Sequence, residues 1–311
     1  TVDTQPTGTT ANETIDGPPT VSVTDASGNE LSNVSLTASL NGSTALHGTT
    51  TVDTNDTGVA TFEDLRVKDV GTYTLTIEVG DDSTVNATTA PVEITAAAAD
   101  SVTVDTQPVA STAGESVGGP PRANVTDAFG NPVADENVTV TINESVDLGG
   151  STEIETDADG IAAFGDLNVT EPGTYELTFA LSDDNTVTTT TDAFEVESAD
   201  GASITVDTQP IETTANESIN GPPTLTVTDE FGNPVEGVDV TATLNDSGLQ
   251  GTTTVSTNDT GLAVFDVLRV KTAGDYNLTF ELTADSSVNA TTDPFEITAA
   301  TPDSVDAADT A

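Results

Sequence analysis

The sequence predicts an all-β protein made of three tandem β-sandwich domains in an extended rod. Two short motifs, Val-Asp-Thr-Gln-Pro and Gly-Pro-Pro, each recur every 102 residues, beginning at Val2, Val104 and Val206 and at Gly17, Gly119 and Gly221. A repeat of about 100 residues has the size of an independent domain. Apolar and polar residues alternate along each copy, a pattern typical of half-buried strands.

We place the domains at residues 1–97, 98–199 and 200–300, followed by a tail at 301–311. The connecting segments are short, so the domains should stack end to end into a rod on the order of 100 Å long, at about 3.3 Å per strand residue. The first copy begins partway into its first strand, which suggests either a processed end or a piece of a longer chain. Asp303-Ser304-Val305 repeats Asp100-Ser101-Val102, so the tail is either a linker or a donor strand.

Within the third copy, apolar residues alternate over 224–228 and 238–244, and the Gly-Asn-Pro at 232–234 predicts a turn between them. Asn258-Asp259-Thr260-Gly261 predicts a second turn, before an apolar stretch at 262–268. A strand over 276–282 and a last one around 295–297 follow. About seven short strands in 100 residues, without helical periodicity, favour an antiparallel sandwich.

Each copy has one tyrosine at the start of its clearest strand, at Tyr73, Tyr175 and Tyr276. A tyrosine here can return its hydroxyl to the backbone at a corner of the sandwich. Stacking on a ligand is the alternative, but these residues share the phase of the inward-facing set. We therefore expect a structural role, worth on the order of 1 kcal/mol for the Tyr276 hydroxyl.

The chain is strongly acidic, with 53 Asp and Glu, 5 Lys and Arg, and a formal charge of −48. At about 1 M salt the screening length falls to roughly 3 Å, which removes most of the self-repulsion. The composition therefore favours a halophilic protein, and it disfavours nucleic-acid binding because the chain would repel phosphates. The chain has no cysteine and therefore no disulfides. It also lacks a run of about 18 apolar residues, which a membrane-spanning helix would need.

The sequence suggests no enzyme and no cofactor. His47 stands alone, with no cysteine to partner it and no counterpart in the other copies. Lys68 and Lys271 occupy matching positions, where an ion pair with the acidic surface is expected. Asp157 and Asp159 resemble the start of a calcium loop, but the closing glutamate of the full pattern is missing. A hairpin turn stabilised by the aspartate explains the same residues, so structural calcium is the lesser alternative.

Asparagine is concentrated in glycosylation acceptor sequences. Fourteen of the nineteen asparagines stand in Asn-x-Ser/Thr, more than chance predicts in a chain whose Ser and Thr make up about a quarter of its residues. We therefore expect N-linked glycans on an exposed surface. Asn277 should point to solvent, since its neighbours face inward. The candidates are Asn41, Asn143 and Asn245, which are spaced 102 residues apart, and Asn86, Asn277 and Asn289.

The order of these signals resembles the bacterial immunoglobulin-like modules of invasin- and intimin-type adhesins. The third copy carries the match at Val227-Thr228-Asp229, Gly232-Asn233-Pro234, Gly261, Phe265, Leu268, Val270, Gly274, Tyr276 and Leu278. The first copy departs from it at Glu30, where the others have proline. The resemblance implies an extracellular, cell-surface setting and modules that act as spacers.

Resemblance and acidity together suggest a surface protein of a halophilic archaeon. Its role would be structural, as a stalk or as a subunit of a filament or surface layer. The alternatives are an adhesin module that binds glycans or a partner cell, and a spacer within a larger secreted enzyme. Copies are expected to associate through strand or end-to-end contacts, with residues 301–311 as the donor strand.

Overall fold

The computed structural model describes residues 1–42, 44–80 and 82–301. Over these residues the regular structure is entirely β, which confirms the predicted fold class. The strands of the first repeat are β1 (Val2–Thr4), β2 (Thr9–Thr10), β3 (Thr20–Ser22), β4 (Ser35–Leu40), β5 (Thr51–Asp53), β6 (Val59–Thr61), β7 (Gly71–Tyr73), β8 (Leu75–Val79), β9 (Asp82–Thr88) and β10 (Val92–Thr95).

The two later repeats contain the same series of strands, with additional short ones. Those of the second are β11 (Ala99–Thr106), β12 (Ser111–Thr112), β13 (Arg122–Asp127), β14 (Asn137–Ile142), β15 (Leu148–Gly149), β16 (Glu153–Glu155), β17 (Ile161–Ala163), β18 (Asn168–Val169), β19 (Gly173–Tyr175), β20 (Leu177–Leu181), β21 (Thr188–Thr190) and β22 (Phe194–Glu197). Those of the third are β23 (Ser203–Thr208), β24 (Thr213–Thr214), β25 (Thr224–Thr228), β26 (Asp239–Leu244), β27 (Leu249–Gln250), β28 (Thr254–Ser256), β29 (Leu262–Val264), β30 (Arg269–Val270), β31 (Gly274–Tyr276), β32 (Leu278–Leu282), β33 (Asn289–Thr291) and β34 (Phe295–Thr298).

The third repeat illustrates the topology. One sheet has the order β23-β25-β29, another has the order β28-β26-β32-β33, and a third has the order β24-β34-β31. The first strand changes sheets, because β23 pairs antiparallel with β25 and β24 pairs parallel with β34. When β23 is joined with β24, β31 with β32 and β33 with β34, the predicted seven strands remain, beside the short ribbon of β27 and β30.

Each repeat has its own hydrophobic core, and the described residues contain three separate clusters. In β25, Leu225 and Val227 are fully buried, while the three threonines that alternate with them are half-buried, as predicted. In the cluster of the third repeat, Phe265 and Phe280 pack with their ring centroids 4.9 Å apart. Separate cores mean that each sandwich buries its own apolar faces.

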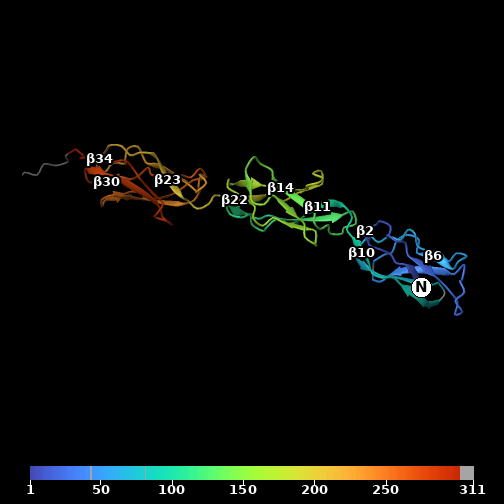
Figure 1. Ribbon diagram of the computed structural model, residues 1–311. Helices are drawn as coiled ribbons and strands as arrows, with labels where there is room; N and C mark the ends of the chain where they lie inside the picture. The colour runs from blue at the N-terminus through green and yellow to red at the C-terminus, as the bar shows by residue number, and fades with distance from the viewer. Residues whose placement is uncertain (43, 81, 302–311) are drawn as a thin grey trace, which may run out of the picture.

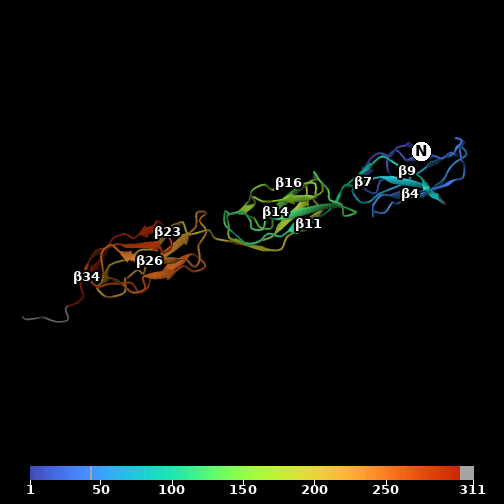
Figure 2. The same cartoon turned by 90° about the horizontal axis from the view of Figure 1, so that it is seen from below.

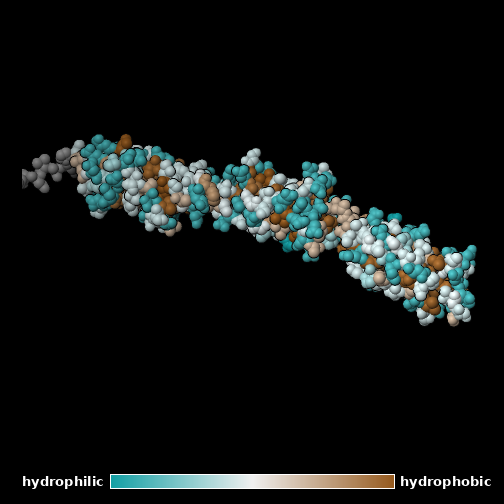
Figure 3. Space-filling model, viewed as in Figure 1, coloured by the Kyte–Doolittle hydropathy of each residue, from teal (hydrophilic) through white to brown (hydrophobic). Residues whose placement is uncertain are grey.

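The repeats follow one another along a single long axis in both views of the chain (Figures 1 and 2). The connection between the first two repeats is short, because β10 ends at Thr95 and β11 already begins at Ala99, where it pairs with Asp127. The space-filling view shows a largely hydrophilic to neutral surface with small, scattered hydrophobic patches (Figure 3). No helix in the described part of the chain has the length and apolar character needed to cross a membrane.

Candidate functional site: the joints between repeats

The loop after β13 forms a turn around one buried aspartate. Asp127 Oδ1 accepts the backbone N–H groups of Phe129 and Asn131, both at 2.9 Å, and Asn131 Nδ2 donates to Asp127 Oδ2 at 2.8 Å. Gly130 makes the turn possible with a φ of 85°, which side chains rarely adopt. Asp127 and Asn131 are only 2% and 6% exposed, so these bonds are shielded from water.

The same loop attaches the second repeat to the first. Asn131 Nδ2 donates to the carbonyl of Lys68 at 2.7 Å, and Asn131 Oδ1 accepts the N–H of Val70 at 3.0 Å. Asp127 Oδ2 accepts the N–H of Ala97, in the connecting segment, at 3.0 Å. The loop thus bonds both to the segment before β7 of the preceding sandwich and to the segment that connects the two sandwiches. We call this set of contacts, with its equivalent at Asp229 and Asn233, a joint.

The second joint repeats the first with one difference. Asn233 Nδ2 donates to the carbonyl of Thr170 at 2.8 Å, and Asp229 Oδ2 accepts the N–H of Ala199 at 3.1 Å. Pro172 stands where the first repeat has Val70, so it has no N–H to offer to the asparagine. Ser198 supplies another bond across this joint, from its hydroxyl to the Pro234 carbonyl at 2.8 Å.

A phenylalanine lies at the tip of each joint loop. Lys68 Nζ lies 5.7 Å from the ring centroid of Phe129, within cation–π range, so the ion pair expected for this lysine is replaced by an aromatic contact. Phe231 packs against Gly114 of the preceding repeat so closely that an added Cβ would lie 2.3 Å from the ring. Both aromatic rings therefore extend the contact between neighbouring repeats.

The joint aspartates are ionised at neutral pH. Burial raises the pKa of Asp127, but the hydrogen bonds from Asn131, Ala97 and Phe129 outweigh burial and hold this pKa below its ordinary value of 3.8. The pKa of Asp229 is lowered in the same way, with burial opposing the bonds from Asn233, Ala199 and Phe231. The carboxylate form is the one that can accept all of these donors.

The first repeat contains the same turn, and within the described residues no other repeat bonds to it. Asp25 Oδ1 accepts the N–H groups of Ser27 and Asn29 at 2.8 and 2.9 Å, and Asn29 Nδ2 donates to Asp25 Oδ2 at 2.8 Å. The pKa of Asp25 is lowered, chiefly by the side-chain bond from Asn29. The turn is therefore a local property of the sequence, whereas the joint requires a second sandwich.

Two of the three tyrosines confirm the corner prediction. The Tyr175 hydroxyl donates to the Glu171 carbonyl at 2.9 Å, and that of Tyr73 donates to Asp69 and Val70 carbonyls at 3.2 and 3.1 Å. Burial first, and then the charges of Glu171 and Glu144, raise the pKa of Tyr175. Tyr276 is equally buried, but within the described residues its hydroxyl has no such bond, so the bond expected there is wrong.

The acidic turn at Asp157 and Asp159, a candidate for calcium, has the geometry of a hairpin turn stabilised by its aspartate. Asp157 Oδ1 accepts the N–H groups of Asp159 and Ile161 at 2.9 and 3.0 Å. Asn55 and Asn258 make the same two bonds in the other repeats. The described residues hold no cluster of three or more acidic, histidine or cysteine side chains placed for a metal. Calcium at Asp157 and Asp159 stays a prediction, which a chelator titration of the thermal midpoint would test.

The glycosylation candidates differ in how their amides are used. Asn41, Asn143 and Asn245 are exposed, and the side-chain Oδ1 of each accepts a backbone N–H. Asn86 and Asn289 instead donate through Nδ2 to the carbonyls of Ser83 and Ser286, each three residues earlier. Asn277 is half-buried and donates to the Thr292 carbonyl at 3.0 Å, so it does not simply point to solvent.

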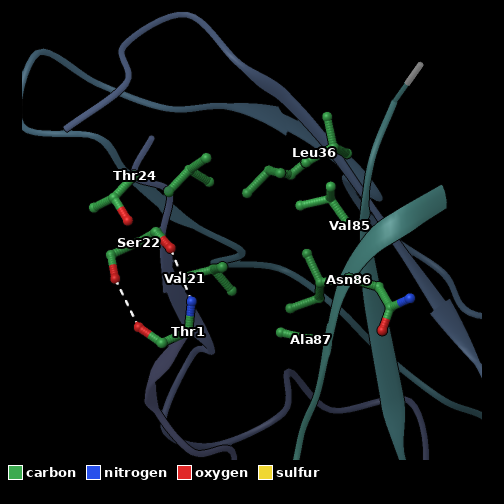
Figure 4. Close-up of a pocket in the computed structure, with 11 residues that line it drawn as sticks. Thr1, Val21, Ser22, Thr24, Leu36, Val85, Asn86 and Ala87 are labelled. Carbon is green, nitrogen blue, oxygen red and sulfur yellow. Dashed lines mark hydrogen bonds between the residues drawn. The ribbon is translucent and has the colours of Figure 1, made fainter. Parts of the chain in front are cut away.

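An open groove of about 140 Å³ lies beside the first strand, between β3 and the β8–β9 hairpin (Figure 4). Thr1 donates from its amino group to the Ser22 carbonyl at 2.9 Å, at one end of the groove. In the later repeats, Val102 pairs with Val125 and Ile204 pairs with Val227. Val23 is the equivalent of Val125 and Val227 in the first repeat, and it lines the groove. The groove lies beside the position that Val102 and Ile204 occupy in the later repeats, with Val85 and Leu36 on its far wall.

This chain is similar to known proteins in both sequence and structure. No protein-family model matches the sequence. The inverse autotransporter adhesin YeeJ of Escherichia coli (strain K12) is 35% identical over 151 residues, which cover 46% of this chain and 6% of that protein. The solved structure of the Escherichia coli adhesin FdeC superposes with a TM-score of 0.60 at 17% identity, over 97% of this chain and 99% of that chain. Yersinia pseudotuberculosis InvD superposes with a TM-score of 0.49 at 16% identity, over 95% and 97%.

The fold is immunoglobulin-like. FdeC carries this conclusion, since its superposition extends over nearly the whole of both chains. The chain spans only a small part of the length of YeeJ, so the activity of that whole protein does not pass to it directly. The sequence predicted the Gly-Asn-Pro turn of these immunoglobulin-like repeats but not that the turn connects one repeat to the next. A signal for this role was present, because Asp127 and Asn131 recur as Asp229 and Asn233.

Proposed function

We propose that this chain is part of an extracellular surface adhesin, in which its repeats form the rod that holds a binding region away from the cell. The comparisons favour the adhesin role over a purely structural stalk, because YeeJ and FdeC are both adhesins. The linear arrangement of the repeats supports the assignment of reach to this segment. The two roles combine when a stalk is one component of an adhesin.

The joints are the observation that carries this proposal. A short connection keeps neighbouring sandwiches close together, but it does not by itself fix the angle between them. Here a buried aspartate and asparagine bond to the preceding repeat and to the connecting segment at once. Opening the joint would exchange these shielded hydrogen bonds for bonds to water, which is unfavourable. The rod is therefore stiff at its connections, and a stiff rod projects farther than a flexible chain of equal length.

The double variant Asn131→Ala, Asn233→Ala tests the proposal. Small-angle X-ray scattering should show a shorter mean maximum dimension and a wider distribution, and negative-stain images should show variable angles between repeats. Asn29→Ala is the matched control, because it removes the same turn bond at a position where, within the described residues, no other repeat is bonded. A double variant as extended as wild type, with all repeats folded, would contradict the assignment.

The second candidate function is that this segment is itself the binding module. The adhesin relatives favour it, while the surface in view has only small, scattered hydrophobic patches. Saturable binding of the isolated chain to cells or to a glycan array would establish it. The same measurement on the joint variants would show whether binding depends on the rod.

The halophilic archaeal source remains part of the proposal and rests on acidity alone. The relatives named above come from Escherichia coli and Yersinia pseudotuberculosis. Association between copies also belongs to the proposal. Its expected donor strand falls almost entirely on residues 302–311, which lie outside the described residues. Deleting 301–311 should abolish filaments in electron micrographs, and unaltered filaments would refute strand donation.

A further inference from the structure

One asparagine occupies the same position in each repeat, directly after the strands β4, β14 and β26. Its backbone N–H and its side-chain Oδ1 both bond to the residue after the repeat's tyrosine. In the second repeat, Asn143 N donates to the Glu176 carbonyl at 3.1 Å and Asn143 Oδ1 accepts the Glu176 N–H at 3.0 Å. In the third, Asn245 makes both bonds with Asn277 at 3.2 Å.

These bonds orient the side-chain amide. Because the amide is planar, fixing Oδ1 against the neighbouring strand directs Nδ2 away from that strand. Asn143 and Asn245 are exposed, and within the described residues their Nδ2 atoms donate no hydrogen bond to the protein. Ser145 and Ser247, which complete the acceptor sequences, are exposed as well. The group that a glycosyltransferase must reach is therefore free, although the residue itself is held in place.

We propose that Asn143 and Asn245, together with the equivalent Asn41, are N-glycosylation sites of this protein, one in each repeat. The co-reactant is an oligosaccharide linked to a lipid through phosphate. The amide Nδ2 attacks the anomeric carbon of the sugar, the N–C bond forms and the C–O bond to phosphate breaks. The lipid phosphate leaves with the electron pair, and a base of the transferase removes the amide proton.

Asn86, Asn277 and Asn289 lack this geometry. Asn86 Nδ2 donates to the Ser83 carbonyl at 3.0 Å, and Asn289 Nδ2 donates to the Ser286 carbonyl at 3.0 Å. Asn277 is half-buried and donates to Thr292. A glycan on any of these would have to reorient an amide that stabilises its own turn or strand. A glycan on Asn143 leaves the Oδ1 bond to Glu176 intact.

The position of these sites gives the glycan a purpose in the rod. Asn41 accepts the N–H of Thr74. Thr74 follows, by four to six residues, the joint residues Lys68 and Val70, which bond to Asn131. A hydrophilic chain attached there stands at the end of the repeat that receives the next one. It would shield the joint and the connecting segment from proteases. This shielding rests on the rod proposal, whereas the assignment of the sites does not.

Glycopeptide mass spectrometry of the chain purified from a host that performs N-glycosylation tests the assignment. Peptides with Asn143 and Asn245 should carry sugar mass, and peptides with Asn86 and Asn289 should be bare. Ser145→Ala and Ser247→Ala remove the acceptor sequence but keep the asparagine and its Oδ1 bond. Each should abolish the sugar at its own site with an unchanged thermal midpoint, so that loss of sugar cannot be attributed to misfolding.

Two outcomes would overturn the assignment. One is an unmodified mass at Asn41, Asn143 and Asn245 when a reporter glycoprotein in the same cells is modified. The other is sugar on Asn86 or Asn289 while Asn143 and Asn245 stay bare. Neither outcome bears on the scattering experiment with the joint variants, so the rod proposal and the glycan assignment can fail separately.

Discussion

Asn131 can connect two domains because an amide side chain donates and accepts at the same time, whereas Asn233 bonds to the preceding repeat as a donor alone. Asn131 uses Nδ2 for both Asp127 and Lys68, while its Oδ1 receives Val70. Aspartate at this position would place two carboxylates together and would offer no donor to the Lys68 carbonyl. The chemistry of the joint therefore depends on asparagine itself and not on any small polar residue.

The tyrosines allow a matched comparison at single-residue resolution. Tyr175→Phe removes a buried hydroxyl that is bonded to the Glu171 carbonyl, so it should lower the free energy of unfolding of the second repeat by about 0.5–1.5 kcal/mol. Tyr276→Phe removes a hydroxyl without such a bond and should cost much less. Denaturant unfolding of the two variants checks this. Equal losses would contradict the difference between the two corners.

At the scale of strands and loops, alternation placed the strands well. The predicted strand at 224–228 coincides with β25, and the predicted stretch at 238–244 contains β26. The short strands β24 and β27 escaped prediction, because two residues carry no detectable period. The acidic and asparagine-containing turns were also readable, since Asp25 closes its turn without help from any other repeat.

The joint loops should respond to acid in a defined direction. Because the folded-state pKa of Asp127 and Asp229 is lowered, their contribution to stability is complete above the ordinary aspartate value of 3.8. It is lost as pH falls through the lower folded-state pKa. The rod should therefore keep its scattering dimensions from pH 7 to well below pH 5 and loosen only in stronger acid.

The double variant Asp127→Asn, Asp229→Asn provides the control for this prediction. An amide cannot accept at both of its terminal atoms, so the joints should already be loose at pH 7. Acid should then cause no further loosening at the joints, and other carboxylates can be judged against that baseline. Wild-type protein that loosens between pH 7 and pH 5 would contradict the assignment of the acid response to these two groups.

At the scale of the whole molecule, charge repulsion opposes folding in dilute salt. A formal charge of −48 opposes the close approach of the acidic repeats when ions are scarce. Raising NaCl from about 0.1 M to about 1 M shortens the screening length from roughly 10 Å to 3 Å. The thermal midpoint should rise over this range, as differential scanning calorimetry would show. A midpoint that rises equally in sucrose of matched osmolality, or does not rise at all, would argue against charge screening.

Local patterns in the chain were enough to establish the repeat, the all-β class, the strand alternation and the turns, because these depend on residues that are near one another in sequence. They also marked the acceptor asparagines. The folded arrangement was needed to separate Asn143 from Asn289, since that difference lies in which carbonyl or N–H reaches the amide. It likewise showed that Asn131 meets Lys68, 63 residues earlier in the chain. Contacts of that kind arise from how two folded sandwiches fit together, and no local pattern encodes them.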